Sequence, residues 1–217
     1  MKLVPLDIDK EFPPNLCQNK TSVFQFELTH KGVDNARLAQ FILELEKKKG
    51  SSWRGSLRGG WHSDKRLFQR HKETFQHLHD IIKTCAMKIL NSSESSVKVM
   101  HSWANIIQKG HYNDKHSHGH YPLVACYYVS TDTAQNSVLP PAPEPSATRN
   151  SVGVASGRRP SEGAGGLGDS GGEFVATCLK IAPKPGMLLI FPGNMDHEVL
   201  KYKGVKPRIS IACNIRL

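Results

Sequence analysis

The hydrophobic period of the chain changes at the segment VKVMHSWAN, residues 97–105. One set of alternate residues comprises Val97, Val99, His101, Trp103 and Asn105, and the other comprises Lys98, Met100, Ser102 and Ala104. A period of two is typical of a β-strand whose two faces meet different surroundings. This segment therefore predicts a strand, and it separates two parts of the chain with different periods.

Upstream of residue 97 the apolar residues recur at a helical spacing. One helix is predicted over residues 33–49, and a longer one is predicted after Ser63, a residue type that suits an N-cap. The stripe of the first helix comprises Leu38, Phe41, Ile42 and Leu45, and that of the second comprises Phe68, Phe75, Leu78, Ile82, Cys85 and Ile89. Residues 50–60 between them are rich in Gly and Ser and predict a loop.

Short segments rich in β-branched and aromatic residues predict most of the remaining strands. They cover residues 123–130, 175–181, 187–191, 198–202 and 208–215, and a further alternating segment covers residues 24–28. Helices followed by strands, without regular strand–helix alternation, indicate an α+β layout and not a parallel Rossmann sheet.

The segment from Thr131 to about Gly172 has a different composition. It holds eight glycines and five prolines, many Ser and Ala residues, and almost no large apolar side chains. Such a segment cannot bury enough apolar surface to offset the entropy of ordering it. We therefore interpret it as a disordered insertion between two strands.

Composition excludes several classes of protein. The chain has 217 residues, of which 38% are hydrophobic, which suits one domain with a buried core. No apolar run approaches the ~20 residues of a membrane-spanning helix, and the N-terminal MKLVPLDIDKEF lacks the apolar region of a secretory signal. The five cysteines are widely separated, which argues against a disulfide framework and a zinc ribbon. We expect an intracellular, cytoplasmic protein without a membrane partner.

The net charge of +10 is unevenly distributed. Residues 47–72 contain nine Lys or Arg residues and a single acidic residue, Asp64. This basic belt could meet nucleic acid or an acidic protein, or form a solvated face. Because no nucleic-acid-binding motif accompanies it, nucleic acid is only weakly supported as a partner.

The histidines are the most informative feature of the sequence. His116, His118 and His120 form the run HSHGH just before the strand predicted at residue 123, and His197 follows much later in the chain. On an extended segment, residues i and i+2 point the same way, so a neighbouring pair from this run could address one metal ion with His197. Imidazole ligands suit iron, zinc, copper and nickel.

The last predicted strand carries a possible anion clamp. Arg208 and Ser210 lie on the same face of this strand. The guanidinium fork of Arg matches a carboxylate, and a Ser hydroxyl adds a further donor. The alternative is an Arg that is paired with an internal carboxylate or exposed at an edge.

Taken together, these motifs resemble a known family. They comprise W-A-N at 103–105, H-S-H at 116–118, LVACYYV at 123–129, GMLLIFP at 186–192, His197 and RISIACN at 208–214. This order resembles the Fe(II)/2-oxoglutarate-dependent oxygenases, most closely their prolyl-hydroxylase-like group. The resemblance covers roughly residues 97–130 and 175–217, and GGWHSD at 59–64 also resembles the N-terminal part of that group.

The resemblance implies a double-stranded β-helix, the jelly-roll or cupin-like core, with the N-terminal helices packed on it. Residues 1–96 would form a helical support region of the same domain, and residues 97–217 would form the core, interrupted at about 131–172. The implied activity is that of a dioxygenase, most simply a hydroxylase, which couples oxidative decarboxylation of 2-oxoglutarate to oxidation of a substrate that the sequence does not specify. Its partners would be dioxygen and 2-oxoglutarate.

The resemblance also assigns site residues. Fe(II) would be held by His116, His118 and His197, and the distal carboxylate of 2-oxoglutarate by Arg208 and Ser210. Either Tyr127 or Tyr128 could add a hydrogen bond to this cosubstrate. Asn105 is a further inner-face candidate there, and Asn214 is another, with structural hydrogen bonding expected for each.

Three alternatives remain open. Most of the wider superfamily has Asp or Glu at the position of His118, so Asp114 or Asp196 could supply a carboxylate instead. The same three histidines could also hold zinc in a hydrolase, or the jelly roll could be a non-catalytic module that binds polyanions.

Overall fold

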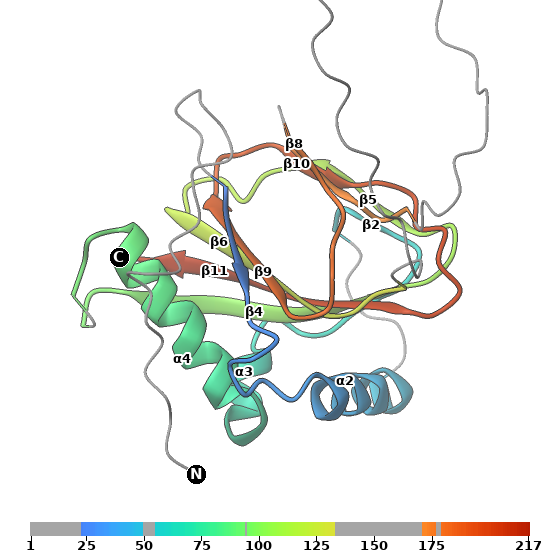
Figure 1. The fold of residues 1–217 in the computed structure, drawn as a ribbon, viewed down its shortest axis with the longest axis horizontal. Helices are drawn as coiled ribbons and strands as arrows, with labels where there is room; N and C mark the ends of the chain where they lie inside the picture. The colour runs from blue at the N-terminus through green and yellow to red at the C-terminus, as the bar shows by residue number, and fades with distance from the viewer. Residues whose placement is uncertain (1–22, 50–54, 94, 133–170, 177–178) are drawn as a thin grey trace, which may run out of the picture. The chain divides into compact units, whose positions relative to one another are not determined.

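The computed structural model describes residues 23–49, 55–93, 95–132, 171–176 and 179–217. These residues form two antiparallel β-sheets with helices on one of them (Figure 1). The helices are α2 (Asn35–Lys49), α3 (Leu67–Arg70) and α4 (Lys72–Ile89). None of the described helices has the length and apolar character needed to span a bilayer.

The larger sheet has six strands in the order β1-β9-β6-β11-β4-β3. Their bounds are β1 (Phe24–Glu27), β9 (Met187–Pro192), β6 (Leu123–Ser130), β11 (Arg208–Arg216), β4 (Lys98–Ile107) and β3 (Trp61–His62). The smaller sheet has five strands in the order β2-β5-β10-β7-β8. Their bounds are β2 (Leu57–Arg58), β5 (Tyr112–His116), β10 (His197–Val199), β7 (Phe174–Ala176) and β8 (Leu179–Ile181). The α+β class and the antiparallel strands confirm the layout expected from the sequence.

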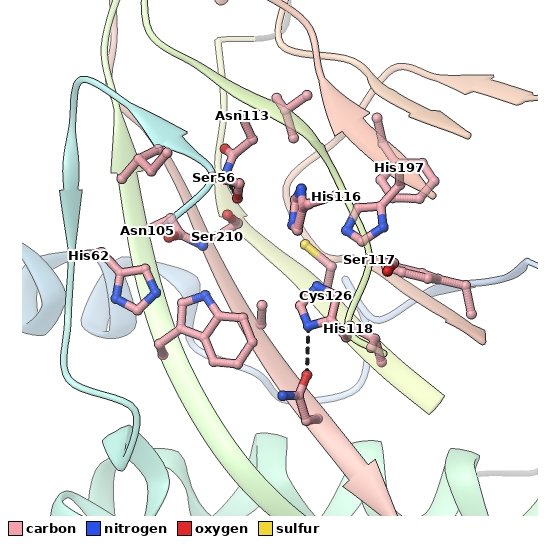
Figure 2. Close-up of a pocket in the computed structure, with 18 of the residues that line it drawn as sticks. Ser56, His62, Asn105, Asn113, His116, Ser117, His118, Cys126, His197 and Ser210 are labelled. Atoms are coloured by element: carbon pink, nitrogen blue, oxygen red, sulfur yellow. Dashed lines mark hydrogen bonds between the residues drawn. The ribbon is translucent and has the colours of Figure 1, made fainter. Parts of the chain in front are cut away.

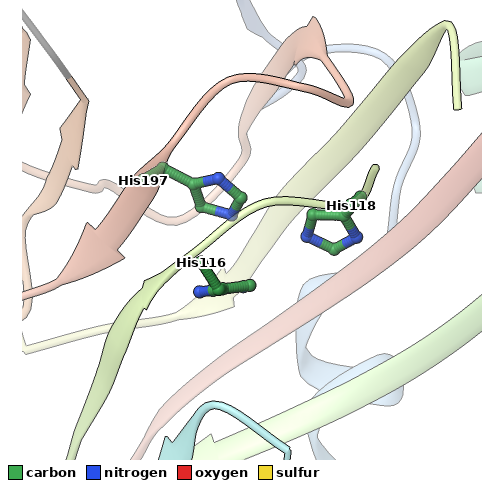
Figure 3. Close-up of side chains that lie close together, drawn as sticks. All are labelled: His116, His118 and His197. Atoms are coloured by element: carbon green, nitrogen blue, oxygen red, sulfur yellow. The ribbon is translucent and has the colours of Figure 1, made fainter. Parts of the chain in front are cut away.

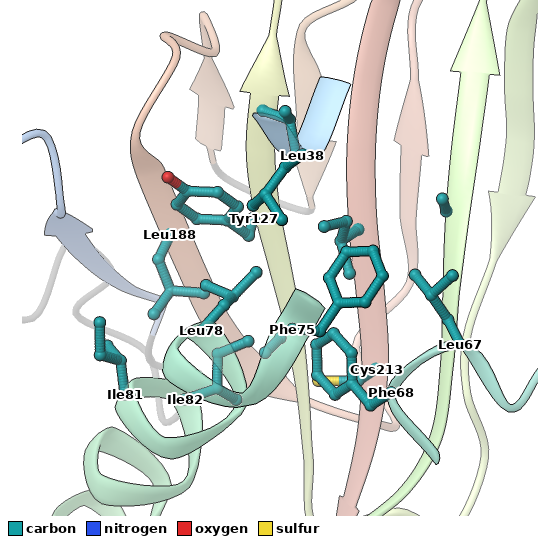
Figure 4. Packing of buried hydrophobic residues seen from close by; sticks show 14 of the residues in the cluster. Leu38, Leu67, Phe68, Phe75, Leu78, Ile81, Ile82, Tyr127, Leu188 and Cys213 are labelled. Carbon is teal, nitrogen blue, oxygen red and sulfur yellow. The ribbon is translucent and has the colours of Figure 1, made fainter. Parts of the chain in front are cut away.

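The helices cover the outer face of the six-stranded sheet (Figure 1). On β11 the odd-numbered residues from Ile209 to Ile215 belong to this interface, together with Tyr127 of β6 and Leu188 of β9. From α4, Phe75, Leu78 and Ile82 reach the same cluster (Figure 4). Each strand of this sheet therefore packs one face on the helices. On β11, the even-numbered residues face the space between the two sheets.

The inner face of the six-stranded sheet is mixed in character. Part of it, including Tyr128, Leu189 and Phe191, packs against Phe174 of β7 in a second apolar cluster. The rest, with Arg208 and Ser210 on β11, is polar and buried. Buried polar residues beside an apolar cluster indicate a site and not a simple core.

The sequence-based prediction of the helices is confirmed for α2 and corrected for the second helix. That helix is divided into α3 and α4 at His71, and it does not begin at Ser63. The Ser63 hydroxyl accepts the N–H of Ala104 at 2.9 Å and so joins the chain to β4. Ser63 therefore bonds to β4 and does not cap a helix as the sequence predicts.

Three strands were not predicted, and one predicted strand is two. β2 and β3 are two-residue strands at the end of and just beyond the predicted loop, and β5 has the polar sequence YNDKH. The segment 175–181 is not one strand, because β7 and β8 pair antiparallel with each other. Apolar periodicity cannot reveal strands that are very short or polar.

Two glycines make the corner that carries the chain from β2 in one sheet to β3 in the other. Gly59 and Gly60 have φ angles of +74° and +71°. A Cβ atom on Gly60 would lie 2.3 Å from the carbonyl oxygen of Ile106. The corner therefore requires glycine, and it brings His62 into register with Asn105 of β4.

The predicted insertion lies mostly outside the described residues, which resume at Gly171. Its two described ends both meet the segment that leads to β11. Gly171 forms a bridge with Tyr202, and the Tyr202 hydroxyl accepts the N–H of Asp132 at 2.9 Å.

Candidate metal centre

Three histidines converge between the two sheets (Figure 3). His116, the last residue of β5, lies opposite His197, the first residue of β10, in the antiparallel register. His118 lies two residues beyond β5, where its backbone N–H donates to the Gly193 carbonyl at 2.7 Å. The candidate ligand atoms all lie within 4.8 Å of one another, so they could hold one metal ion.

Each of the three rings has a hydrogen-bond partner on Nδ1. His116 is paired with the Asp114 carbonyl at 2.7 Å, and His197 with the Met195 carbonyl at 3.0 Å. His118 is paired with Oδ1 of Asn214 at 2.8 Å. Because all three partners are oxygen acceptors, Nδ1 must carry the proton and Nε2 has the free lone pair. This is the arrangement that metal-ligating histidines commonly show.

The three rings are neutral at ordinary pH. Burial, together with the neighbouring histidines, lowers the pKa of His118 to about 4 and that of His197 to about 3. Burial also lowers the pKa of His116. A neutral imidazole is the form that binds metal, so protons do not compete for these nitrogens near neutrality.

The two carboxylates that were alternative ligands have other partners. Asp114 forms an ion pair with Arg58 of β2. Asp196 lies 3.7 Å from the Lys115 ammonium group and is largely exposed. In the described part of the chain, the group able to hold a metal consists of the three histidines alone.

The histidines line one end of a cavity of about 310 Å³ (Figure 2). This volume is at the lower end of the range for small-molecule sites. A row of polar residues crosses the floor from β6 to β3, because Tyr128, Ser210, Asn105 and His62 are successive partners in the register. Among the described residues that line the cavity, none is acidic.

Arg208 lies in the same cavity and is 2% exposed. Its guanidinium carbon is 4.9 Å from the centre of the Tyr128 ring, and Nη1 is 3.5 Å from the Ser210 hydroxyl. Within the described part of the chain no carboxylate pairs with it, and its Nε has no hydrogen-bond partner. A buried, unpaired guanidinium is costly, so this geometry calls for an anionic ligand.

Two further buried polar atoms lack a hydrogen bond of ordinary geometry. They are the Tyr128 hydroxyl and Oδ1 of Asn105. Together with Arg208 Nε they are all such side-chain atoms in the described residues, and all three residues line this one cavity. Because buried polar groups in folded proteins are nearly always paired, the three atoms mark a ligand site.

The structure separates the two candidate tyrosines. Tyr127 points to the helical side of the sheet, where its hydroxyl donates to Oδ1 of Asn35 at 2.6 Å. It does not line the cavity, which corrects its assignment as a cosubstrate residue. The strand period forces this outcome, since neighbouring residues of β6 face opposite ways.

Some residues that line the cavity are not predicted from the sequence. His62 is buried and stacks on Trp103 with ring centres 5.7 Å apart, and Lys65 and Cys126 also line the cavity. Burial lowers the pKa of His62 and raises that of the Cys126 thiol. GGWHSD at 59–64 was the available signal for His62, but only the pairing of β3 with β4 brings this side chain to the site.

Comparisons with known proteins agree with this geometry. A family model described as "Putative 2OG-Fe(II) oxygenase" matches residues 101–214, which is more than half of the chain. No curated protein matches the chain in sequence.

Solved structures of other proteins share the fold. A viral collagen prolyl hydroxylase from Paramecium bursaria Chlorella virus-1, solved with 2OG, is 14% identical to this chain with a TM-score of 0.53. The match covers 89% of this chain and 95% of the viral chain. A Pseudomonas putida prolyl-4-hydroxylase is 14% identical with a TM-score of 0.57, and the match covers 91% of this chain and 93% of the bacterial one. A Trichoplax adhaerens prolyl hydroxylase with a hypoxia inducible factor peptide fragment is 13% identical with a TM-score of 0.56. The match covers 89% of this chain and 83% of the Trichoplax chain. With this likeness of fold and the match of the family model, the chain belongs to the 2OG-Fe(II) oxygenase family.

Proposed function

We propose that this protein is an Fe(II)- and 2-oxoglutarate-dependent hydroxylase whose iron is held by His116, His118 and His197. The distal carboxylate of 2-oxoglutarate would bind Arg208, with Ser210 and Tyr128 beside it. One observation carries the proposal: the three histidines lie in the same cavity as a buried guanidinium that has no carboxylate partner in the described part of the chain.

The donor set fits a divalent transition metal. Neutral imidazole nitrogens suit iron as well as zinc, and this set has a third histidine where the common non-haem Fe(II) set has a carboxylate. Because the three ligands are neutral, the ion would keep its full formal charge in the site. That charge favours binding of an anionic cosubstrate.

Bound iron would supply the oxidative chemistry, which couples oxidative decarboxylation of 2-oxoglutarate to oxidation of the prime substrate. The residues of the chain bind, orient and exclude water. Arg208 offers a charge-assisted contact to the distal carboxylate, and the Tyr128 hydroxyl and the Asn105 side chain have the unused hydrogen-bonding capacity to complete it. Phe174 and Phe191 form an apolar wall beside His197 and limit access of water.

We extend the proposal to the architecture. Residues 97–217 would supply most strands of a double-stranded β-helix. Residues 1–96 would be a support region of the same domain that is not purely helical, because its strands β1, β2 and β3 join the two sheets. The antiparallel order of the sheets and the position of the site between them support this assignment.

The prime substrate is best sought first among prolyl-containing peptides. Solved structures with the same fold include prolyl hydroxylases, one of them with a bound peptide fragment. Polar side chains among the lining residues, Ser56 and Ser117, could contact such a chain.

The test is an anaerobic titration of the metal-free protein with Fe(II) and then with 2-oxoglutarate. We expect a visible charge-transfer band when the cosubstrate chelates the iron. His197→Ala should abolish the band, and Arg208→Ala should raise the concentration of 2-oxoglutarate required by more than about tenfold, or ~1.4 kcal/mol.

His120→Ala is the matched control, because this exposed histidine of the HSHGH run is outside the cluster. It should leave the titration unchanged. A folded protein that gives no band, or a band that survives in His197→Ala, would overturn the proposed site. Stoichiometric zinc without any response to 2-oxoglutarate would point to the hydrolase alternative.

A further inference from the structure

His118 is held differently from the other two histidines of the cluster. In His116 and His197, Nδ1 pairs with the backbone carbonyl two residues earlier in the chain. Their own segments therefore fix both rings. His118 lies beyond the end of β5, and its Nδ1 pairs instead with a side chain from another strand, Asn214 of β11, at 2.8 Å (Figure 2).

The faces of the His118 ring are also occupied. The Trp103 ring stacks on it with centres 5.7 Å apart and an interplanar angle of 17°. The His197 ring stacks on it at 5.2 Å and 10°. Trp103 is on β4, directly opposite Ala212 of β11 in the register. Much of the support for this ring thus comes from the six-stranded sheet, whereas His116 and His197 belong to the five-stranded sheet.

We propose that Asn214 is a positioning residue that makes His118 a metal ligand; this inference rests on the proposed metal site. Oδ1 of Asn214 can only accept a hydrogen bond, so it requires the proton of His118 on Nδ1 and leaves Nε2 free for the metal. Asn214 is 7% exposed, so water does not readily replace it as the partner.

The assignment gives β11 two roles. Arg208 and Ser210 lie on its inner face near one end, and Asn214 lies on the same face near the other end. One strand therefore positions the third metal ligand and also carries the carboxylate clamp.

The experiment measures Co(II) affinity of the metal-free protein by visible absorption in competition with a chelator. Asn214→Leu keeps a similar volume but removes the acceptor, and we expect its Co(II) affinity to fall about 10- to 100-fold. Asn214→Asp keeps the acceptor and should bind Co(II) at least as tightly as the wild type. Asn113→Leu is the matched control, because Asn113 lines the cavity but bonds to Ser56, and it should not change the affinity.

Two readouts separate a positioning role from a structural one. In the proton spectrum of the Co(II) protein, three exchangeable Nδ1–H signals are expected, and Asn214→Leu should lose one. Combining Asn214→Leu with His118→Ala should weaken Co(II) binding no further than His118→Ala alone. If Asn214→Leu fails to fold, Asn214→Ala provides the same test with a smaller side chain.

The results distinguish an error in the role of Asn214 from an error in the proposed metal site. If His118→Ala binds Co(II) as the wild type does, the three-histidine site itself is wrong. If His118→Ala loses affinity while folded Asn214→Leu keeps both its affinity and all three signals, only the role of Asn214 is overturned. Loss of affinity in both Asn214→Leu and Asn214→Asp would also contradict it, since the conservative variant should restore the contact.

Discussion

Tyr127 and Tyr128 show how neighbouring residues acquire different roles. The Tyr127 hydroxyl has a partner in the protein, Asn35, whereas the Tyr128 hydroxyl faces the cavity without a hydrogen bond of ordinary geometry. Side chains that alternate across a strand meet entirely different surroundings. The pair therefore offers a matched comparison at the scale of one hydroxyl group.

Replacing each tyrosine with Phe should give opposite results. Tyr127→Phe should lower the free energy of unfolding by about 1 kcal/mol and leave 2-oxoglutarate binding unchanged. Tyr128→Phe should leave the stability of the ligand-free protein unchanged and weaken 2-oxoglutarate binding by about tenfold, the value of a hydrogen bond to a charged group. Urea unfolding and cosubstrate titration check both, and equal effects of the two variants would refute the assignment.

The buried histidines predict an acid-dependent loss of stability in the metal-free protein. Folding lowers the pKa of His118 to about 4 and that of His197 to about 3, whereas the unfolded chain restores values near ~6.5. The unfolded state therefore binds more protons, so the stabilisation is complete above about pH 6.5 and is lost as the pH falls toward 4 and then 3.

We expect the urea midpoint of the metal-free protein to fall steadily between about pH 7 and pH 5.5. His197→Gln should reduce this slope, because it removes one of the groups that titrate. His120→Gln, at an exposed position, should not. A midpoint that is constant over this range would contradict the neutral, buried state of the cluster.

At the scale of elements, the short connection from β2 to β3 is the feature that completes the wall of the site. Gly60 combines a positive φ of +71° with a close approach to Ile106. Gly110 has a φ of +89°, but a Cβ atom on it would meet no other atom of the described residues within 4 Å. Backbone conformation is thus unfavourable to Ala at both positions, but only Gly60 adds a steric conflict.

Gly60→Ala should therefore destabilise the protein more than Gly110→Ala does. Each variant should lose ~1–2 kcal/mol of folding stability, because Ala is unfavourable in the left-handed conformation. Gly60→Ala should lose more, because the new Cβ atom would push β3 away from β4. Thermal unfolding measures the difference. Equal shifts in Tm for the two variants would show that the β2–β3 corner tolerates a side chain.

The helices and the long strands were recognisable from sequence, and the reason is their burial. α2 and α4 bury one stripe each, and β6, β9 and β11 bury both faces, so their apolar residues are numerous and regularly spaced. β5 was missed because its sequence YNDKH has no apolar period. Its neighbours in the sheet and not its own residues define it as a strand.

At the scale of the whole molecule, the site joins the two sheets. Two of the three histidines belong to strands of the five-stranded sheet, and the Arg208 clamp belongs to the six-stranded sheet. A cosubstrate bound to both would connect them. Ligands that bind only the folded state stabilise it by mass action, about 2.7 kcal/mol at a concentration of 100 times Kd.

We expect Co(II) to raise the Tm of the metal-free protein and 2-oxoglutarate to raise it further when Co(II) is present. Arg208→Ala should keep the shift caused by Co(II) and lose most of the second shift. His116→Ala should lose both, since the cosubstrate would have no metal to chelate. Anaerobic thermal unfolding checks this order, and a full 2-oxoglutarate shift in Arg208→Ala would show that the clamp lies elsewhere.

The α+β layout and most of the long elements can be predicted from the sequence. So can the candidate histidines of HSHGH with His197, among which the family resemblance selects three, and the Arg208–Ser210 pair. Each of these depends on local periodicity or on residue chemistry, which a linear chain displays directly. The fold is needed to show that Tyr128 and not Tyr127 lines the cavity and that the two nearby aspartates pair with cations. It also shows that His62 joins the site and that Asn214 bonds to His118. These outcomes depend on strand register, which pairs residues far apart in the chain, and a one-residue change of register would reverse every one of these faces.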